Sequence, residues 1–334
     1  MTSVPAESPD SRLPEGLRGR LKTRLLGAQQ TGLIGAMVVF AVIIELSNPT
    51  FLGAGNVISL LRGSVLTFIV GTGETLVLIG GGLDLSVGSL YTAGGVAAGE
   101  LMVQHVDAPL AIAFGITVGA LAGLVNGAVI VYTDVPPLIA TLGMQFAAIG
   151  LVDVVTNGTA LYPFPGGFNA LGSGSVGGIP DLVVYGIVLG IAVHLLLERT
   201  TFGYDVRAIG GNRAAAIACG VKVNKRTMQL YVLSGAIAAV GGILLASELQ
   251  SAQANVGSGF ELQVIVAAII GGTSLFGGVG TIFGTALGAI LIGMLNNGLI
   301  VVNVSANWQV FAIGVLVVAA VAVDRARRRR QWRR

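Results

Sequence analysis

Charged residues are scarce in this sequence: Asp, Glu, Lys and Arg make up 10% of its 334 residues, whereas soluble domains carry about 25%. Hydrophobic residues account for 54% of the chain, and its mean hydropathy is +0.85. So few charges cannot cover a globular surface in water, which excludes an ordinary soluble domain. We therefore predict an all-α, polytopic membrane protein.

Residues that build disulfides, metal sites and nucleotide sites are also few. The single cysteine, Cys219, excludes an intrachain disulfide. The two histidines, His105 and His194, do not approach a metal-site pattern, so we predict no metal site. No GxxxxGK[ST] motif occurs, so the chain cannot form a phosphate-binding P-loop of its own. We expect no cofactor and no catalytic residues in this chain.

Glycine is abundant, at 51 residues, about twice the usual ~7%. Small residues let membrane helices approach closely. A spanning helix needs about 20 apolar residues, and ten stretches qualify. They are 27–46, 63–82, 86–103, 109–131, 136–156, 181–197, 228–247, 261–276, 281–303 and 307–323. The eighth is short and includes Gly271-Gly272, so we consider it broken or re-entrant.

Basic residues cluster in three segments, which hold 18 of the 19: residues 1–26, 198–228 and 325–334. The positive-inside rule places these segments in the cytoplasm. We therefore predict a flexible cytoplasmic tail (1–26), a transmembrane domain (27–324) with a cytoplasmic loop (198–228), and a basic cytoplasmic tail (325–334). Arg62 is the exception and falls outside. Directly after a span, the Arg-rich tail fixes orientation and meets anionic lipid rather than nucleic acid.

The polar loop at 198–228 contains a predicted short helix. Asn212 is suited to accept hydrogen bonds from the first turn, and Arg213 to Cys219 is rich in alanine. Gly220 can adopt the left-handed conformation that ends a helix, and Gly210-Gly211 are expected to form the turn before it. The helix either lies on its own protein or docks into a partner, and we favour docking.

The most distinctive string is Gly80-Gly-Gly-Leu-Asp-Leu-Ser-Val-Gly-Ser. A charged side chain among apolar residues is costly in a membrane. We expect Asp84 to cap the helix that begins near Ser86. The string supplies five residues to which we assign a structural role: Gly81, Gly82, Asp84, Ser86 and Gly88.

Other polar residues fall within predicted spans. Glu74 lies near the middle of its span, where an acid is a functional candidate by default; the alternative is a protonated or paired contact between helices. Asn126, Asn296 and Asn297 can hydrogen-bond a polar solute or join helices, and we favour the joining of helices. We take these four residues as candidates for a translocation path.

A weak internal repeat links the segments around Asn126-Gly127 and Asn297-Gly298. If the match is real, spans two to five correspond to spans seven to ten in opposite orientation. Asn126 and Asn297 would then be equivalent. Inverted repeats commonly build a path at the bilayer centre.

Three strings together carry a family resemblance: GGLDLSVGS, then RAIGGNRAAAIACGV, then IIGGTSLFGGVGT with LNNGL. In this order they resemble the membrane permease subunit of bacterial ABC importers for monosaccharides, of the ribose, xylose and galactose branch. The resemblance covers residues 31 to 324. Glu74 departs from the neutral residue typical of that family at this position.

The resemblance implies a ten-helix subunit in the bacterial cytoplasmic membrane that pairs with a second permease, here a second copy. It also implies an external solute-binding protein and a cytoplasmic ATPase subunit that binds ATP and magnesium. By the same resemblance, the short loop helix couples the chain to the ATPase. The coupling candidates are Arg207, Gly210, Gly211, Asn212, Arg213, Ala215, Ile217 and Gly220.

Other transport mechanisms are also open from the residues alone. An ion-coupled secondary transporter also uses inverted repeats and buried acids such as Glu74. A passive channel is a further alternative. Within ABC importers, the solute can instead be an amino acid or a nucleoside. An ABC importer requires an ATPase subunit for uptake, whereas a secondary transporter or a passive channel does not.

Overall fold

The computed structural model of the chain describes residues 15–332, which form helices and one short β-hairpin. Seven of the helices are long and apolar enough to cross a membrane, which confirms the predicted all-α polytopic fold. The elements are α1 (Glu15–Ser47), α2 (Ala54–Ile79), α3 (Val87–Val103), α4 (Ala108–Tyr132), α5 (Pro137–Thr156), α6 (Ala170–Ser173), β1 (Ser175–Val176), β2 (Ile179–Pro180), α7 (Asp181–Arg199), α8 (Thr201–Gly211), α9 (Arg213–Ala218), α10 (Val223–Leu249), α11 (Phe260–Ile270), α12 (Ile282–Val301) and α13 (Ala306–Trp332).

Each of the ten predicted spans corresponds to a helix, but several boundaries differ. The first helix begins at Glu15, so residues 15–26 are helical although we expected a flexible tail there; no proline interrupts the sequence from 15 to 48. Residues 1–14 lie outside the described part. The last helix continues to Trp332, through most of the basic tail.

The eighth predicted span, 261–276, is helical only in α11 (Phe260–Ile270), so it is short, as expected. The helix ends at Ile270, where Gly271 acts as C-cap and Gly272 adopts a left-handed φ of 103°. A turn-rich loop of residues 271–281, here named the α11–α12 loop, then leads into α12.

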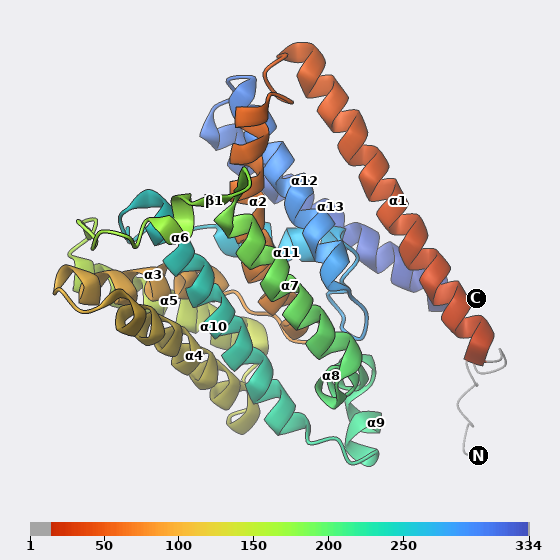
Figure 1. Cartoon of the computed structure of the whole chain (residues 1–334). Helices are drawn as coiled ribbons and strands as arrows, with labels where there is room; N and C mark the ends of the chain where they lie inside the picture. Colours follow the sequence, from red (N-terminus) through yellow and green to blue (C-terminus); the bar gives the residue numbers. More distant parts are fainter. Residues whose placement is uncertain (1–14, 333–334) are drawn as a thin grey trace, which may run out of the picture.

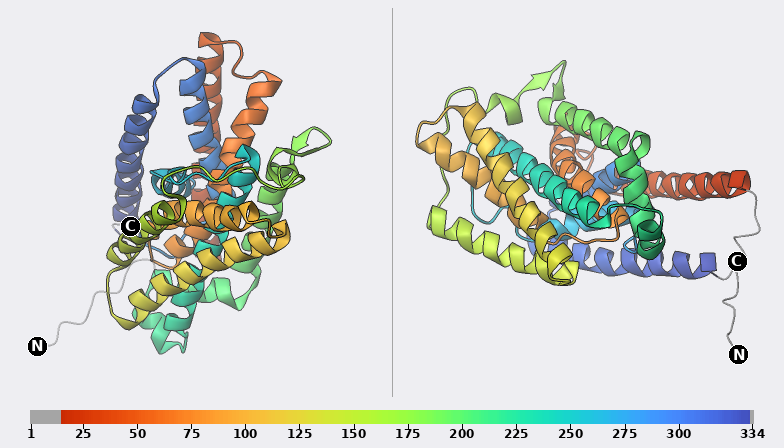
Figure 2. Two further views of the ribbon diagram at one scale, coloured as in Figure 1. Left: turned by 90° about the vertical axis from the view of Figure 1, so that its left-hand side faces the viewer. Right: turned by 90° about the horizontal axis from the view of Figure 1, so that it is seen from below.

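Helix α10 lies at the centre of the molecule, between α4 and α7 (Figures 1 and 2), and packs against α2, α3 and α4. Its contact with α4 depends on glycines one turn apart. A Cβ on Gly119 or Gly123 would overlap the backbone carbonyl of Gly235 or Tyr231 on α10. Close backbone approach through glycine holds membrane helices together where lipid gives no hydrophobic drive.

The packing of the helices supports the inverted repeat. Helix α10 packs on α3 and α4, as α2 packs on α11 and α12; α3 contacts α4 and α5, as α11 contacts α12 and α13. Helices α10 to α13 begin roughly 170 residues after α2 to α5. The same offset relates Asn126 to Asn297.

The two ends of the molecule differ. Helices α8 and α9 lie at one end of α7 and α10, and α6 with the β-hairpin lies at the other (Figure 1). Helix α2 finishes beside α8, because the Ile79 carbonyl adjoins Gly210, whereas α10 finishes beside α6, because Glu248 adjoins Gly172. The two corresponding helices therefore run in opposite directions, as an inverted repeat requires.

Candidate functional site

The predicted short helix in the 198–228 segment is present as α9. Asn212 is its N-cap: the side-chain Oδ1 accepts a hydrogen bond from the backbone N–H of Ala215 at 3.0 Å. Gly220 has a φ of 82°, and its N–H donates to the Ile217 carbonyl at 2.9 Å. Both predicted ends of the helix are confirmed to within one residue.

A second helix, α8, precedes α9, and our expectation of a turn at Gly210-Gly211 was wrong. Both glycines are the last residues of α8. The signal for this helix was in the sequence: Phe202, Val206 and Ile209 are spaced four and three apart and are buried. Helix α8 is thus an amphipathic element that lies against the membrane helices.

Charged groups fix α8 in place. Arg207, one of the coupling candidates, donates to the Gly280 carbonyl at 3.2 Å and pairs with Glu198. Asp205 pairs with Arg226 at 2.7 Å. Arg207 therefore serves contacts within the chain.

Helix α9 presents a different face to the surroundings. Arg213 and Ala215 are exposed, and Ile217 is an exposed apolar side chain at 58%. Ala216, in contrast, is buried against Ile209 and Val223. Ala216 therefore packs α9 against its own subunit. The opposite, alanine-rich face, with Ile217 as its one large apolar side chain, is exposed.

We predicted that Asp84 caps α3, but Ser86 is the N-cap of that helix. Asp84 lies two residues earlier and is buried in the interior. Its Oδ1 accepts from the Ser86 N–H at 3.0 Å and from Ser86 Oγ at 2.5 Å. Its Oδ2 accepts from Ser234 Oγ on α10 at 2.9 Å. Asp84 thus joins the segment before α3 to α10.

Two of the four path candidates belong to the same group. Glu74 is fully buried, and its Oε1 accepts from the backbone N–H of Asp84 at 3.3 Å. Asn126 Nδ2 donates to Ser86 Oγ at 2.9 Å. With Ser234 these residues form a buried polar cluster between α2, α3, α4 and α10, in which the buried Glu74 Oε2 has no hydrogen-bond partner among the described residues.

The other two path candidates join helices elsewhere. Asn296 on α12 donates to Gln263 on α11 at 2.9 Å. Asn297 exchanges hydrogen bonds with Asn56 on α2 at 2.8 and 2.9 Å. Hydrogen bonds of this kind between side chains stabilise helix packing in membranes. The structure therefore divides the four candidates between three separate places.

The glycines of the GGLDLSVGS string lie at close contacts. Gly81 has a φ of 79° and lies against Gly210 of α8. A Cβ on Gly82 would lie 2.6 Å from the Tyr231 hydroxyl, and one on Gly88 would lie 2.5 Å from the Gly257 carbonyl. The left-handed φ at Gly81 favours glycine, whereas Gly82 and Gly88 lie where a larger residue would clash.

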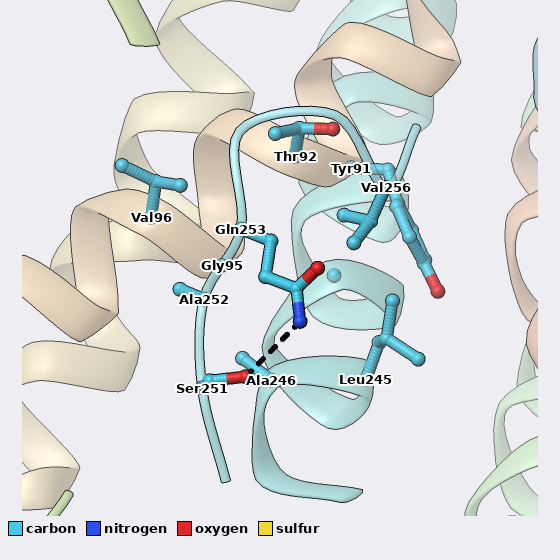
Figure 3. Close-up of a pocket in the computed structure, with 11 residues that line it drawn as sticks. Tyr91, Thr92, Gly95, Val96, Leu245, Ala246, Ser251, Ala252, Gln253 and Val256 are labelled. Carbon is cyan, nitrogen blue, oxygen red and sulfur yellow. Dashed lines mark hydrogen bonds between the residues drawn. The ribbon is translucent and has the colours of Figure 1, made fainter. Parts of the chain in front are cut away.

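A shallow pocket lies near the α6 end, between α3, α10 and the segment after α10 (Figure 3). Its volume is about 200 Å³ and includes the solvent at its mouth. Gln253 projects into it and donates to Ser251 Oγ at 3.4 Å, with Tyr91 and Thr92 on the wall. None of the predicted path residues lines this pocket.

The sequence is similar to known transport proteins. The family described as "Branched-chain amino acid transport system / permease component" matches residues 56–321. The ribose import permease protein RbsC of Escherichia coli (strain K12) is 38% identical over 304 residues, covering 89% of this chain and 93% of the relative.

Two further relatives carry other sugars in their names. The D-allose transport system permease protein AlsC of Escherichia coli (strain K12) is 34% identical over 289 residues, covering 86% of this chain and 89% of the relative. The galactose/methyl galactoside import permease protein MglC of Salmonella typhimurium is 33% identical over 322 residues, covering 91% and 96%. No solved structure matches the chain. Because the matches extend over most of its length, this protein belongs to the family of transport-system permease components that includes these import permeases.

Proposed function

We propose that this chain is the transmembrane permease subunit of an ATP-driven importer and forms the path for a monosaccharide. The observation that carries the proposal is the extent of the similarity: relatives named for import of ribose, allose and galactose cover at least 86% of the chain. The family description names branched-chain amino acids, but these relatives, matched over nearly their whole length, favour a sugar.

The ATPase is proposed to be a separate cytoplasmic subunit that binds ATP and magnesium. The sequence has no P-loop of its own. Helix α9 offers a docking element, because Ala215 and Ile217 face outward while Asn212 and Gly220 set where the helix begins and ends. Small side chains allow a close approach to a partner, and the exposed Ile217 supplies an apolar anchor.

The other proposed partners are a second copy of this chain and an external solute-binding protein. Both termini and the α8–α9 end are proposed to lie in the cytoplasm, because 18 of 19 basic residues belong to those segments. The α6 end is then the external side, where the binding protein delivers its sugar.

The residues of this chain act in transport by holding and moving helices. The buried polar cluster ties α2, α3, α4 and α10 together through Asp84, Ser86 and Ser234. The pairs made by Asn296 and Asn297 tie α12 to α11 and α2. Hydrogen bonds between side chains can exchange partners when helices shift, so these sites can rearrange while most of their polar groups stay paired.

The decisive experiment is uptake into vesicles that contain this chain with its ATPase subunit and its binding protein. Labelled ribose, allose, galactose and leucine are supplied outside, with and without ATP on the side of the ATPase. We expect ATP-dependent accumulation of one of the monosaccharides and none of leucine. Accumulation that persists without the ATPase subunit and follows an ion gradient would contradict the proposal.

A further inference from the structure

The three sequence strings that carry the family resemblance lie far apart in the chain, yet their glycines meet at one point. Gly81 belongs to the first string, Gly210 to the second, and Gly277 and Gly278 to the third. A Cβ placed on Gly277 would lie 2.9 Å from the Gly210 Cα and 3.0 Å from the Gly81 Cα. We name these four residues the glycine junction.

Contacts at the glycine junction join backbone to backbone. The N–H of Gly278 donates to the Ile79 carbonyl, the last residue of α2, at 2.8 Å. A Cβ on Gly210 would overlap that same carbonyl. A side chain at a contact can change its rotamer and so absorb a displacement, but two backbone segments in direct contact cannot. Close-packed interiors therefore transmit strain. A shift of the end of α8 therefore displaces α2 and the α11–α12 loop.

Two side chains tie the α11–α12 loop on either side of the glycine junction. Arg207 on α8 donates to the Gly280 carbonyl at 3.2 Å. Asp324 on α13 accepts from Ser274 Oγ and from the Leu275 N–H, both at 3.2 Å. The loop is thus held by α8 at one point and by α13 at another.

The glycine junction also adjoins the docking helix. Helix α8 ends at Gly211, and Asn212 is both its C-cap and the N-cap of α9. Only Gly211 and Asn212 therefore separate α9 from the junction residue Gly210. Beyond the junction, the chain after α2 leads to Asp84 and hence to α10.

We propose that the glycine junction, with Arg207 and Asp324 as positioning residues, is the connection through which motion of α8 and α9 reaches α2, α11, α12 and α13. This inference rests on the proposed function, because the motion it transmits is the one that an ATPase bound at α9 would impose. The junction belongs to no docking surface in this scheme. It converts docking into movement of the spans.

The test uses the complete importer in vesicles and compares two positions. Gly278→Ala places a Cβ 3.1 Å from the Gly211 Cα at a residue with a φ of 78°. Its control, Gly158→Ala, introduces alanine at a φ of 70° where no atom of the described part of the chain lies within 4 Å. Asp324→Leu removes the acceptor for Ser274 and Leu275, whereas Asp324→Asn keeps an acceptor oxygen and removes only the charge.

We expect Gly278→Ala and Asp324→Leu to retain the ATPase subunit on co-purification but to transport about tenfold less sugar per ATP hydrolysed. Gly158→Ala and Asp324→Asn should transport at the wild-type level. If Gly278→Ala fails to accumulate in the membrane, the comparison of Asp324→Leu with Asp324→Asn tests the inference by itself.

Two results overturn the inference. Wild-type uptake per ATP in both Gly278→Ala and Asp324→Leu would show that the contacts serve packing only. Loss of the ATPase subunit from both variants would place these residues in the docking surface instead. Failure of the proposed function looks different, because the wild-type chain itself would then bind no ATPase subunit or import sugar without ATP.

Discussion

Asp84 accepts three hydrogen bonds through its carboxylate in the buried polar cluster. Its carboxylate accepts from one backbone N–H and from the hydroxyls of Ser86 and Ser234. These groups come from a turn and from α10, 150 residues further along the chain. A single buried carboxylate therefore sets how the segment before α3 meets α10.

We predict that Asp84→Asn is tolerated and Asp84→Ala is not. An asparagine oxygen still accepts from the Ser86 N–H, and its amide can donate to Ser234. Alanine leaves the buried N–H without an acceptor, which costs about 1–3 kcal/mol. Thermal unfolding of the purified variants should show the loss for alanine alone. If Asp84→Asn assembles normally but abolishes transport, the charge itself has a function.

Arg62 illustrates how a basic residue is accommodated away from the basic segments. Its guanidinium donates to the Gly172 carbonyl at 2.7 Å and lies 3.6 Å from the Glu248 carboxylate. These contacts hold α2 to α6 and to the end of α10. The residue that departs from the charge rule therefore has a structural role at the α6 end.

At the scale of elements, α9 is short because Asn212 caps its first turn and the left-handed Gly220 follows its last turn. A six-residue helix has too few internal hydrogen bonds to persist alone in water. Burial of Ala216 against Ile209 and Val223 holds it on α8 and α10. The opposite face remains available to a partner.

We predict that Ala215→Glu weakens binding of the ATPase subunit about tenfold, because overpacking of a tight interface costs about 1–3 kcal/mol. Ala215 is exposed in the subunit, so membrane insertion and thermal stability should not change. Gly211→Val tests the same surface, since a Cβ there meets nothing within 4 Å among the described residues. Co-purification and ATP-driven uptake are the measurements.

Ala215→Ser is the matched control, because it changes the residue with little added volume. It should bind the ATPase subunit as the wild type does. Wild-type binding by both Ala215→Glu and Gly211→Val would show that α9 is not the docking element.

At the scale of the whole molecule, the orientation in the membrane can be tested with the chain's own cysteine. Cys219 is exposed on the α9 end, and Ser173 is exposed on the α6 end. We predict that Ser173→Cys, in a Cys219→Ser background, reacts with an impermeant thiol reagent applied to intact cells. Wild-type Cys219, in the chain expressed alone, should react only after permeabilisation. The reverse pattern would invert the proposed topology.

The sequence by itself determined the class of the protein and the order of its helices. Hydrophobic runs of spanning length cannot be placed in water, so the positions of these runs predicted ten helices, and each has its counterpart in the structure. The caps of α9 were also predictable, because Asn212 and Gly220 act on residues within one turn. Information of this kind is local in the chain.

Only the tertiary structure decided which residues meet. Arg207 was a coupling candidate, and the structure adds that it bonds to Gly280, 73 residues away. Asp84 was expected to cap its own helix, but Ser234 supplies a partner from α10. The glycines of three separate strings converge because helix packing brings α2, α8 and the α11–α12 loop together. Such contacts depend on how helices pack in three dimensions, and neither composition nor periodicity along the chain specifies that arrangement.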